Sequence, residues 1–171
     1  MNIALRIAAA CEALVDGVGR FAAWFTLALV LLISTNVLLR YAFSYGSVAS
    51  QELEWHLLAV VALWGVAYTQ QAGEHVRVDI LYQKYSHRAK LWLDFFTAVF
   101  VMLPFALIIC WLSLGFVDQA YVNHEISPDP GGLKYRFILK SFIATGFALL
   151  VVQSVATAVR IMLRIRGEEK E

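Results

Sequence analysis

Two short clusters of polar residues flank a long apolar run in the first half of the chain. The first cluster holds Glu52, Glu54 and His56. Glu52 and His56 are four residues apart, so on a helix they share a face and their side chains can pair. An acid in the first turn of a helix also interacts favourably with the helix dipole. A capping role is therefore the alternative interpretation of Glu52.

The second cluster, residues 73–79, follows the same run and reads GEHVRVD. Its polar and apolar residues alternate, which indicates an extended or irregular stretch rather than a helix. Arg77 within it suits phosphate headgroups or an acid on a partner protein. Ordinary solvation of a surface arginine is the alternative.

The residue types that can bind haem or metals, histidine and cysteine, are few and scattered along the chain. His56 and His124 lie towards one side of the apolar runs and His75 and His87 towards the other, without HxxxH or HxxE spacing. Haem held between two helices needs histidines at matching depth. The two cysteines form no CxxC pair, and no nucleophile stands beside a base. We expect no catalytic residue, cofactor or metal ion, and neither an enzyme nor a nucleic-acid partner.

The polar clusters lie at the ends of apolar runs, and the chain has four such runs without one Asp, Glu, Lys or Arg. They are Phe21–Leu39, Trp55–Gly73, Phe95–Val117 and Ser141–Val159. About 20 residues of helix span the hydrocarbon layer of a membrane. With 60% hydrophobic and 16% charged residues, the chain is too apolar for a soluble domain. The runs predict an all-α integral membrane protein with four transmembrane helices, as one membrane domain over residues 1–171.

The fourteen lysines and arginines are distributed unevenly about these runs. Ten lie before the first run, between the second and third, or after the fourth, and four lie in the other two connections. Short loops rich in Lys and Arg stay in the cytoplasm. We therefore expect both termini to be cytoplasmic and the other two connections to face outward.

Residues 3–18 place Ile3, Ile7, Cys11, Leu14 and Val18 at helical spacing, with charged residues on another face. This pattern predicts an N-terminal amphipathic helix over residues 1–20, lying in the cytoplasmic interface before the first span. The alternative is that these residues are the first turns of one long, tilted helix.

Polar and small residues within the runs predict contacts between helices. Asn36, Gln153 and His56 are each expected to hydrogen-bond a neighbouring helix. Small residues at Gly65, Thr69 and Gly73 favour close packing within the four-helix unit, with contact to another subunit as the alternative. Pro104 is expected to kink the third span.

The connection before the last run is the clearest turn cluster in the chain. Residues 123–132 contain two prolines and two glycines, which predict a loop that is rigid and sharply bent. On the expected topology this loop faces outward.

The polar clusters form a familiar pattern together. Arg40-Tyr41 is followed by Glu52-Leu53, then by Gly65 thirteen residues after Glu52, then by the 73–79 cluster with Gly73, His75, Arg77 and Asp79. This pattern resembles the small, DctQ-like membrane subunit of tripartite ATP-independent periplasmic (TRAP) transporters, and the resemblance covers nearly the whole chain. The chain departs from the family at Trp55, where a basic residue often stands.

The resemblance implies a subunit of the bacterial inner membrane that binds a much larger membrane subunit and the surrounding membrane lipids. In such transporters the large subunit carries the substrate, typically an organic acid, together with sodium. A separate periplasmic protein captures and delivers that substrate, and the small subunit enlarges the static scaffold. The pattern residues are then candidates for the subunit interface. The candidates for contact with the binding protein are Ser127, Pro128, Asp129, Pro130, Gly131 and Gly132.

Two functions of other classes compete with this interpretation. One is a membrane anchor of a redox enzyme, which would bind haem or quinone. The other is a small exporter working as a homodimer, which would need an acid at membrane depth. The four runs lack such an acid, so they favour a chain that works with a membrane partner.

Overall fold

A computed structural model describes residues 3–73, 82 and 84–167 of the chain. All its regular elements are helices, and no strand occurs among the described residues. The all-α class and the helical state of the four apolar runs are thereby confirmed. In chain order the helices are α1 (Ile3–Phe43), α2 (Val48–Ala72), α4 (His87–Phe96), the π-helix η1 (Thr97–Met102), α5 (Leu103–Val122) and α6 (Arg136–Ile165).

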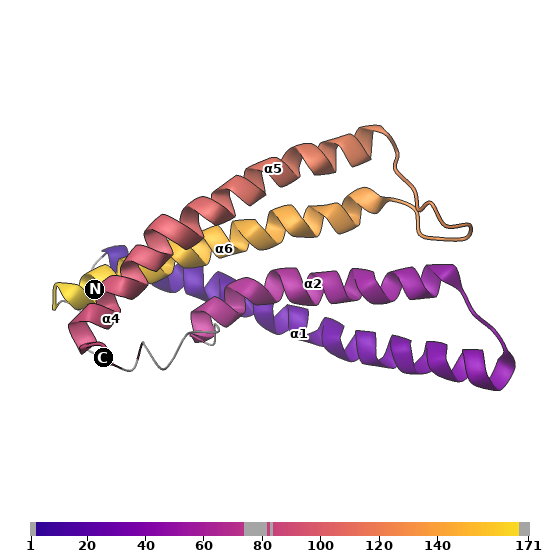
Figure 1. Cartoon of the computed structure of the whole chain (residues 1–171), viewed down its shortest axis with the longest axis horizontal. Coiled ribbons are helices and arrows are strands. Elements are labelled where there is room, and N and C mark those ends of the chain that lie inside the picture. The colour runs from indigo at the N-terminus through magenta and orange to yellow at the C-terminus, as the bar shows by residue number, and fades with distance from the viewer. Residues whose placement is uncertain (1–2, 74–81, 83, 168–171) are drawn as a thin grey trace.

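The helices lie along one another in an elongated bundle (Figure 1). The start of α1 and the end of α6 lie at one end of the bundle, which we call the terminal end. The α1–α2 and α5–α6 connections lie at the opposite end, which we call the loop end. Helix α6 contacts each of the other helices and has eight buried residues. It is therefore the central element of the bundle.

Three helical stretches are long and apolar enough to cross a membrane, namely α1, the continuous stretch His87–Val122, and α6. Helix α2 has 25 residues, which is also sufficient length. It is not among the three, because polar residues such as His56, Gln70 and Gln71 lower its hydropathy. The chain is thus a multi-pass membrane protein.

Helix α1 is one unbroken helix of 41 residues, about 60 Å long at 1.5 Å per residue. The separate interfacial helix predicted before Phe21 is therefore wrong, and the alternative of one long helix is what the structure contains. The smaller Ala8 and Val15 are buried, whereas the apolar Ile3 and Ile7 are exposed. Packing against neighbouring helices selects the small residues and leaves the large apolar ones outside.

The third apolar run contains a π-helical segment, η1, directly before Pro104. Proline has no backbone N–H to donate and its ring clashes with the preceding turn of an α-helix. A π segment widens that turn, and such segments are recognised causes of helix bending. The π-helix thus lies next to the position where a kink was predicted, within a continuous helical stretch.

Glycines bring helices close together, but they are not the glycines that the sequence singled out. A Cβ at Gly146 of α6 would lie 2.7 Å from the carbonyl oxygen of Leu63 in α2, and one at Gly19 would overlap the Tyr68 ring. By contrast, a Cβ at Gly65 or Gly73 would meet no described atom within 4 Å. Close packing within the described helices therefore uses Gly146 and Gly19, and Gly65 remains available to another contact.

Candidate functional site

A buried carboxylate at the loop end holds the predicted turn-rich loop. Glu52 of α2 is only 4% exposed. The Ser127 hydroxyl donates a hydrogen bond to one oxygen of its carboxylate, and the Leu133 N–H donates to the other at 2.5 Å. The Ser127 N–H also donates to the Leu133 carbonyl at 3.1 Å. One side chain thus fastens both ends of the segment 127–133, which we call the latch loop.

Glycine is required where the latch loop passes over this carboxylate. A Cβ at Gly132 would lie 2.5 Å from the Ser127 hydroxyl oxygen and 2.8 Å from the Glu52 carboxylate. Gly131 has a φ of +80°, a conformation that favours glycine. The predicted rigidity and sharp bend are consistent with these contacts. Ser127 and Gly132 are half-buried inside the loop, and its exposed tip consists of Pro128, Asp129, Pro130 and Gly131.

The surroundings of Glu52 stabilise its charged form. Glu52 precedes the uncharged run Trp55–Gly73, and so lies outside the predicted span. The Ser127 hydroxyl and the Leu133 N–H lower the pKa of Glu52, with smaller contributions from the charges of Arg136 and His56. Burial acts in the opposite direction and is outweighed. The latch is therefore a carboxylate at neutral pH.

Two interpretations of Glu52 from the sequence are wrong. The His56 ring contacts the backbone carbonyl of Glu52, with Nδ1 2.6 Å from that oxygen, rather than the carboxylate. The helix begins at Val48 with Ser47 as its N-cap, whose hydroxyl accepts from the Ser50 N–H. Glu52 thus lies beyond the first turn and does not cap the helix. Its carboxylate is directed to the latch loop instead.

The second acid of the cluster ties α2 to α1. The Asn36 side-chain amide donates to the Glu54 carboxylate at 2.6 Å, which confirms that Asn36 bonds a neighbouring helix. Gln153 instead donates to Thr157 of its own helix at 3.3 Å, and His56 also bonds within its own helix. The same expectation for Gln153 and His56 is therefore wrong.

A cation that the sequence did not single out completes the loop end. The Arg136 guanidinium carbon lies 5.6 Å from the centre of the Trp55 ring, within the range of cation–π attraction. Its Nε is 3.8 Å from the Glu125 carboxylate, which also pairs with Lys140. Position 55, where the resemblance implied a basic residue, is thus occupied by an aromatic ring, and Arg136 at the start of α6 supplies a cation beside it. Only the tertiary fold brings these positions together.

The structure separates the remaining pattern residues. Arg40 and Tyr41 are exposed in the last turn of α1 at the loop end. Gly65 lies within α2, and Gly73 caps its far end with a φ of +73°. His75, Arg77 and Asp79 lie outside the described residues. Among the pattern residues that the structure describes, Glu52 is the one hydrogen-bonded to the predicted loop.

The terminal end contains a second charged contact. The Arg160 guanidinium of α6 donates two hydrogen bonds to the Glu12 carboxylate of α1, and both side chains are largely buried. Such two-point pairing fixes orientation as well as charge. No group of three or more His, Cys, Asp or Glu side chains that could hold a metal occurs in the part of the chain that the structure describes.

Comparison with known protein families decides the identity of the chain. Residues 29–164 match the family model described as "Tripartite ATP-independent periplasmic transporters, DctQ component". The chain belongs to the DctQ family. This match includes Glu52, the latch loop and Arg160, and leaves out the first part of α1 with Glu12.

A relative from Haemophilus influenzae (strain ATCC 51907 / DSM 11121 / KW20 / Rd) supports the same assignment. It is named as a TRAP transporter small permease protein and is 30% identical over 144 residues, which cover 82% of this chain and 84% of the relative. As a DctQ protein the chain is a transport component, and its family implies a complex with other TRAP components. The comparisons give no support to the redox-anchor alternative.

Proposed function

We propose that this chain is the small scaffold subunit of a sodium-driven TRAP transporter that imports an organic acid across the bacterial inner membrane. Its partners are a large membrane subunit, which carries the substrate, and a periplasmic binding protein. The observation that carries the proposal is the Glu52 latch, within the region of family similarity. A buried charge used to shape a loop, with none in the apolar runs, suits a scaffold rather than a carrier.

Four spans with both termini in the cytoplasm form part of this proposal. The part of helix α2 within the run Trp55–Gly73 serves as the second span, since it is long enough and α2 contacts α1 and α6 along the bundle. The cation excess near the terminal end favours a cytoplasmic location for that end. Helix α1 is about twice as long as the hydrocarbon layer is thick. Its first part therefore extends into the cytoplasmic interface, with Ile3 and Ile7 towards lipid.

The latch loop is proposed as the contact for the periplasmic binding protein. Its exposed tip would face the periplasm, and Glu52 would keep the tip in one conformation. A preformed loop binds with a smaller loss of conformational entropy than a flexible one. We expect Arg40, Tyr41 and Gly65 to contact the large subunit. Arg40 and Tyr41 are exposed, and a Cβ at Gly65 would meet no described atom within 4 Å.

Transport by the reconstituted complex tests the latch. Glu52→Gln keeps the size of the side chain but removes its charge, so the loop loses its anchor. We expect uptake that depends on the binding protein to fall at least about tenfold, a typical effect when a preorganised contact is lost, while the large subunit still co-purifies. Glu54→Gln, two residues away and bonded to Asn36, is the matched control.

Two outcomes of this experiment separate the parts of the proposal. Unchanged uptake in the Glu52→Gln complex would contradict the role of the latch loop in docking. Failure of the wild-type chain to co-purify with a large TRAP subunit would contradict the scaffold function itself. Uptake of radiolabelled organic acids in the presence and absence of a sodium gradient tests the coupling ion and the substrate class.

A further inference from the structure

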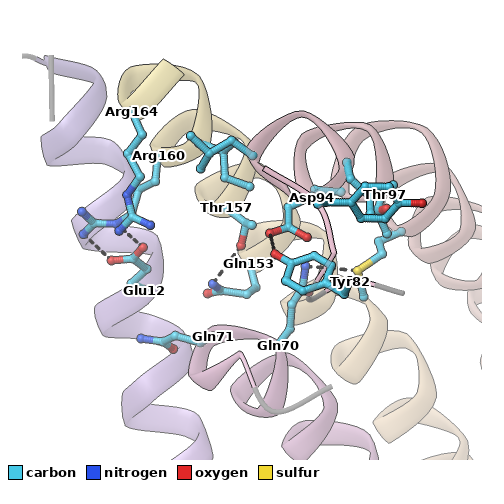
Figure 2. Close-up of a pocket in the computed structure, with 16 residues that line it drawn as sticks. Glu12, Gln70, Gln71, Tyr82, Asp94, Thr97, Gln153, Thr157, Arg160 and Arg164 are labelled. Carbon is cyan, nitrogen blue, oxygen red and sulfur yellow. Dashed lines mark hydrogen bonds and ion pairs between the residues drawn. The ribbon is translucent and has the colours of Figure 1, made fainter. Parts of the chain in front are cut away.

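A cavity of about 880 Å³ opens at the terminal end of the bundle. It is lined by side chains from α1, α2, the α4–η1 stretch and α6, together with Tyr82. Figure 2 shows Glu12 and Arg160 on one side of this space and Tyr82 and Asp94 on the other, with Gln153 and Thr157 between them. Because the lining comes from distant parts of the chain, no local pattern in the sequence signals the cavity.

Two buried amide oxygens in this cavity have no hydrogen-bond partner within the described chain. Gln153 is 2% exposed, and its Nε2 donates to Thr157 while its Oε1 is unpaired. Gln71 likewise has a buried, unpaired Oε1. The adjacent Gln70 differs, because its amide bonds Ser154 and the Met102 sulfur. Buried acceptors are normally paired, so this cavity calls for a hydrogen-bond donor.

The cavity lies where apolar surface gives way to charge. Arg160 is the first charged residue after the uncharged run Ser141–Val159, and Arg164 lines the cavity one turn further on. Tyr82 and Tyr85 also line it, and tyrosines are enriched at the level of lipid headgroups. Deeper in the cavity, Ala98 and Met102 present apolar surface. Headgroup chemistry at one end and apolar lining at the other match an amphiphilic ligand.

We propose that this cavity binds the headgroup of an aminophospholipid, phosphatidylethanolamine in chemical class. Its ammonium group donates hydrogen bonds to the oxygens of Gln153 and Gln71. The acyl chains then follow the apolar lining beside Met102. The ammonium is favoured over an anionic headgroup because both unpaired atoms are acceptors, and because Glu12 already pairs with the Arg160 guanidinium.

Competition between lipids of equal chain length tests this inference on the purified full-length chain. Dioleoyl phosphatidylethanolamine has three N–H donors, whereas dioleoyl phosphatidylcholine has the same charge and none. After delipidation and addition of both lipids in equal amounts, native mass spectrometry should show about tenfold preference for the ethanolamine lipid, the effect of one or two charge-assisted hydrogen bonds. Equal retention of the two lipids would overturn the proposal.

Substitutions locate the site. Gln153→Leu should reduce the preference to about twofold or less, and Gln71→Leu should reduce it partially. Gln119→Leu makes the same change on an exposed position of α5 near the loop end and should leave the preference intact. Circular dichroism and gel filtration identify variants that fold. Preservation of the preference in folded Gln153→Leu and Gln71→Leu would overturn the assignment.

Two further measurements distinguish other occupants. If dioleoyl phosphatidylglycerol is retained as strongly as the ethanolamine lipid, the site selects anions and the proposal fails. If the preference is present in the isolated chain but absent from its complex with the large subunit, a protein side chain occupies the cavity and the proposal fails. Retention of the preference in the complex supports a resident lipid.

Discussion

The buried carboxylate at the loop end and the buried amides at the terminal end differ in how their oxygens are paired. At the loop end, Glu52 receives hydrogen bonds from both ends of a loop of its own chain. At the terminal end, Gln71 and Gln153 keep oxygens unpaired beside a large cavity. Buried polar groups are costly unless they are satisfied. The Glu52 carboxylate is therefore satisfied by the chain itself, although the buried Nε of Arg136 at the same end has no hydrogen-bond partner among the described residues. At the terminal end, both unpaired amide groups border one cavity.

The largest expected effect comes from Gly132→Ala, which would disrupt the hydrogen bonds between the latch loop and Glu52. Its methyl group would overlap Ser127 and the Glu52 carboxylate, and overpacking as close as this is expected to destabilise by about 3 kcal/mol, the upper part of the usual range. Hydrogen exchange in detergent should show loss of protection at the Ser127 and Leu133 amides. Gly131→Ala is the control, since it strains the backbone but meets no described atom within 4 Å. Equal effects of both variants would contradict the latch geometry.

A smaller effect is expected from Glu12→Gln at the terminal end. The change leaves the Arg160 guanidinium without its charged partner in a largely buried contact. We expect a loss of about 2 kcal/mol, below the range for fully buried pairs because both groups retain some exposure. Unfolding by denaturant in mixed micelles measures it. Asp16→Asn removes a more exposed pair with Arg20 and should change stability by less than about 0.5 kcal/mol.

The next prediction concerns how the stability of the loop end depends on the protonation of Glu52. The pKa of Glu52 is lowered in the folded chain, so its contribution to stability is full above the ordinary glutamate pKa. That contribution is lost as pH falls through the lowered value. Protection of the Leu133 amide, corrected for intrinsic exchange, should stay constant from neutral pH down to about pH 5 and fall only in stronger acid. A loss of protection near pH 6 would contradict the assignment of this contribution to Glu52.

The smallest expected effect belongs to Gly65→Ala. A Cβ there meets no described atom within 4 Å, so the isolated chain should change by at most about 1 kcal/mol, in the stabilising direction. If Gly65 contacts the large subunit, co-purification of that subunit should nevertheless fall. Unchanged assembly would remove Gly65 from the interface.

The sequence predicted features that depend on local composition. The uncharged runs identified the helices, and the prolines and glycines of residues 123–132 identified the rigid loop. The partner of Glu52 could not be found this way, because Ser127 lies 75 residues away and the contact depends on how α2 and α6 pack. Arg136 beside Trp55 and the cavity at Gln153 were missed for the same reason. The continuity of α1 was given only as the alternative, and the pair of Asp16 and Arg20 shows that a continuous helix can carry these charges.

The π-helical turn of η1 also determines which side of α4 faces the cavity. A π turn contains one more residue than the α-helical turn it replaces, and one residue corresponds to a rotation of about 100° around the helix axis. Helix α4 is therefore out of phase with α5 by that angle. Deleting one residue from Thr97–Met102 would restore a regular α-helix and rotate α4, with Asp94, by about 100° relative to α5. The extra residue before Pro104 thus sets the rotation of α4 about its axis, and so determines which α4 side chains face the cavity.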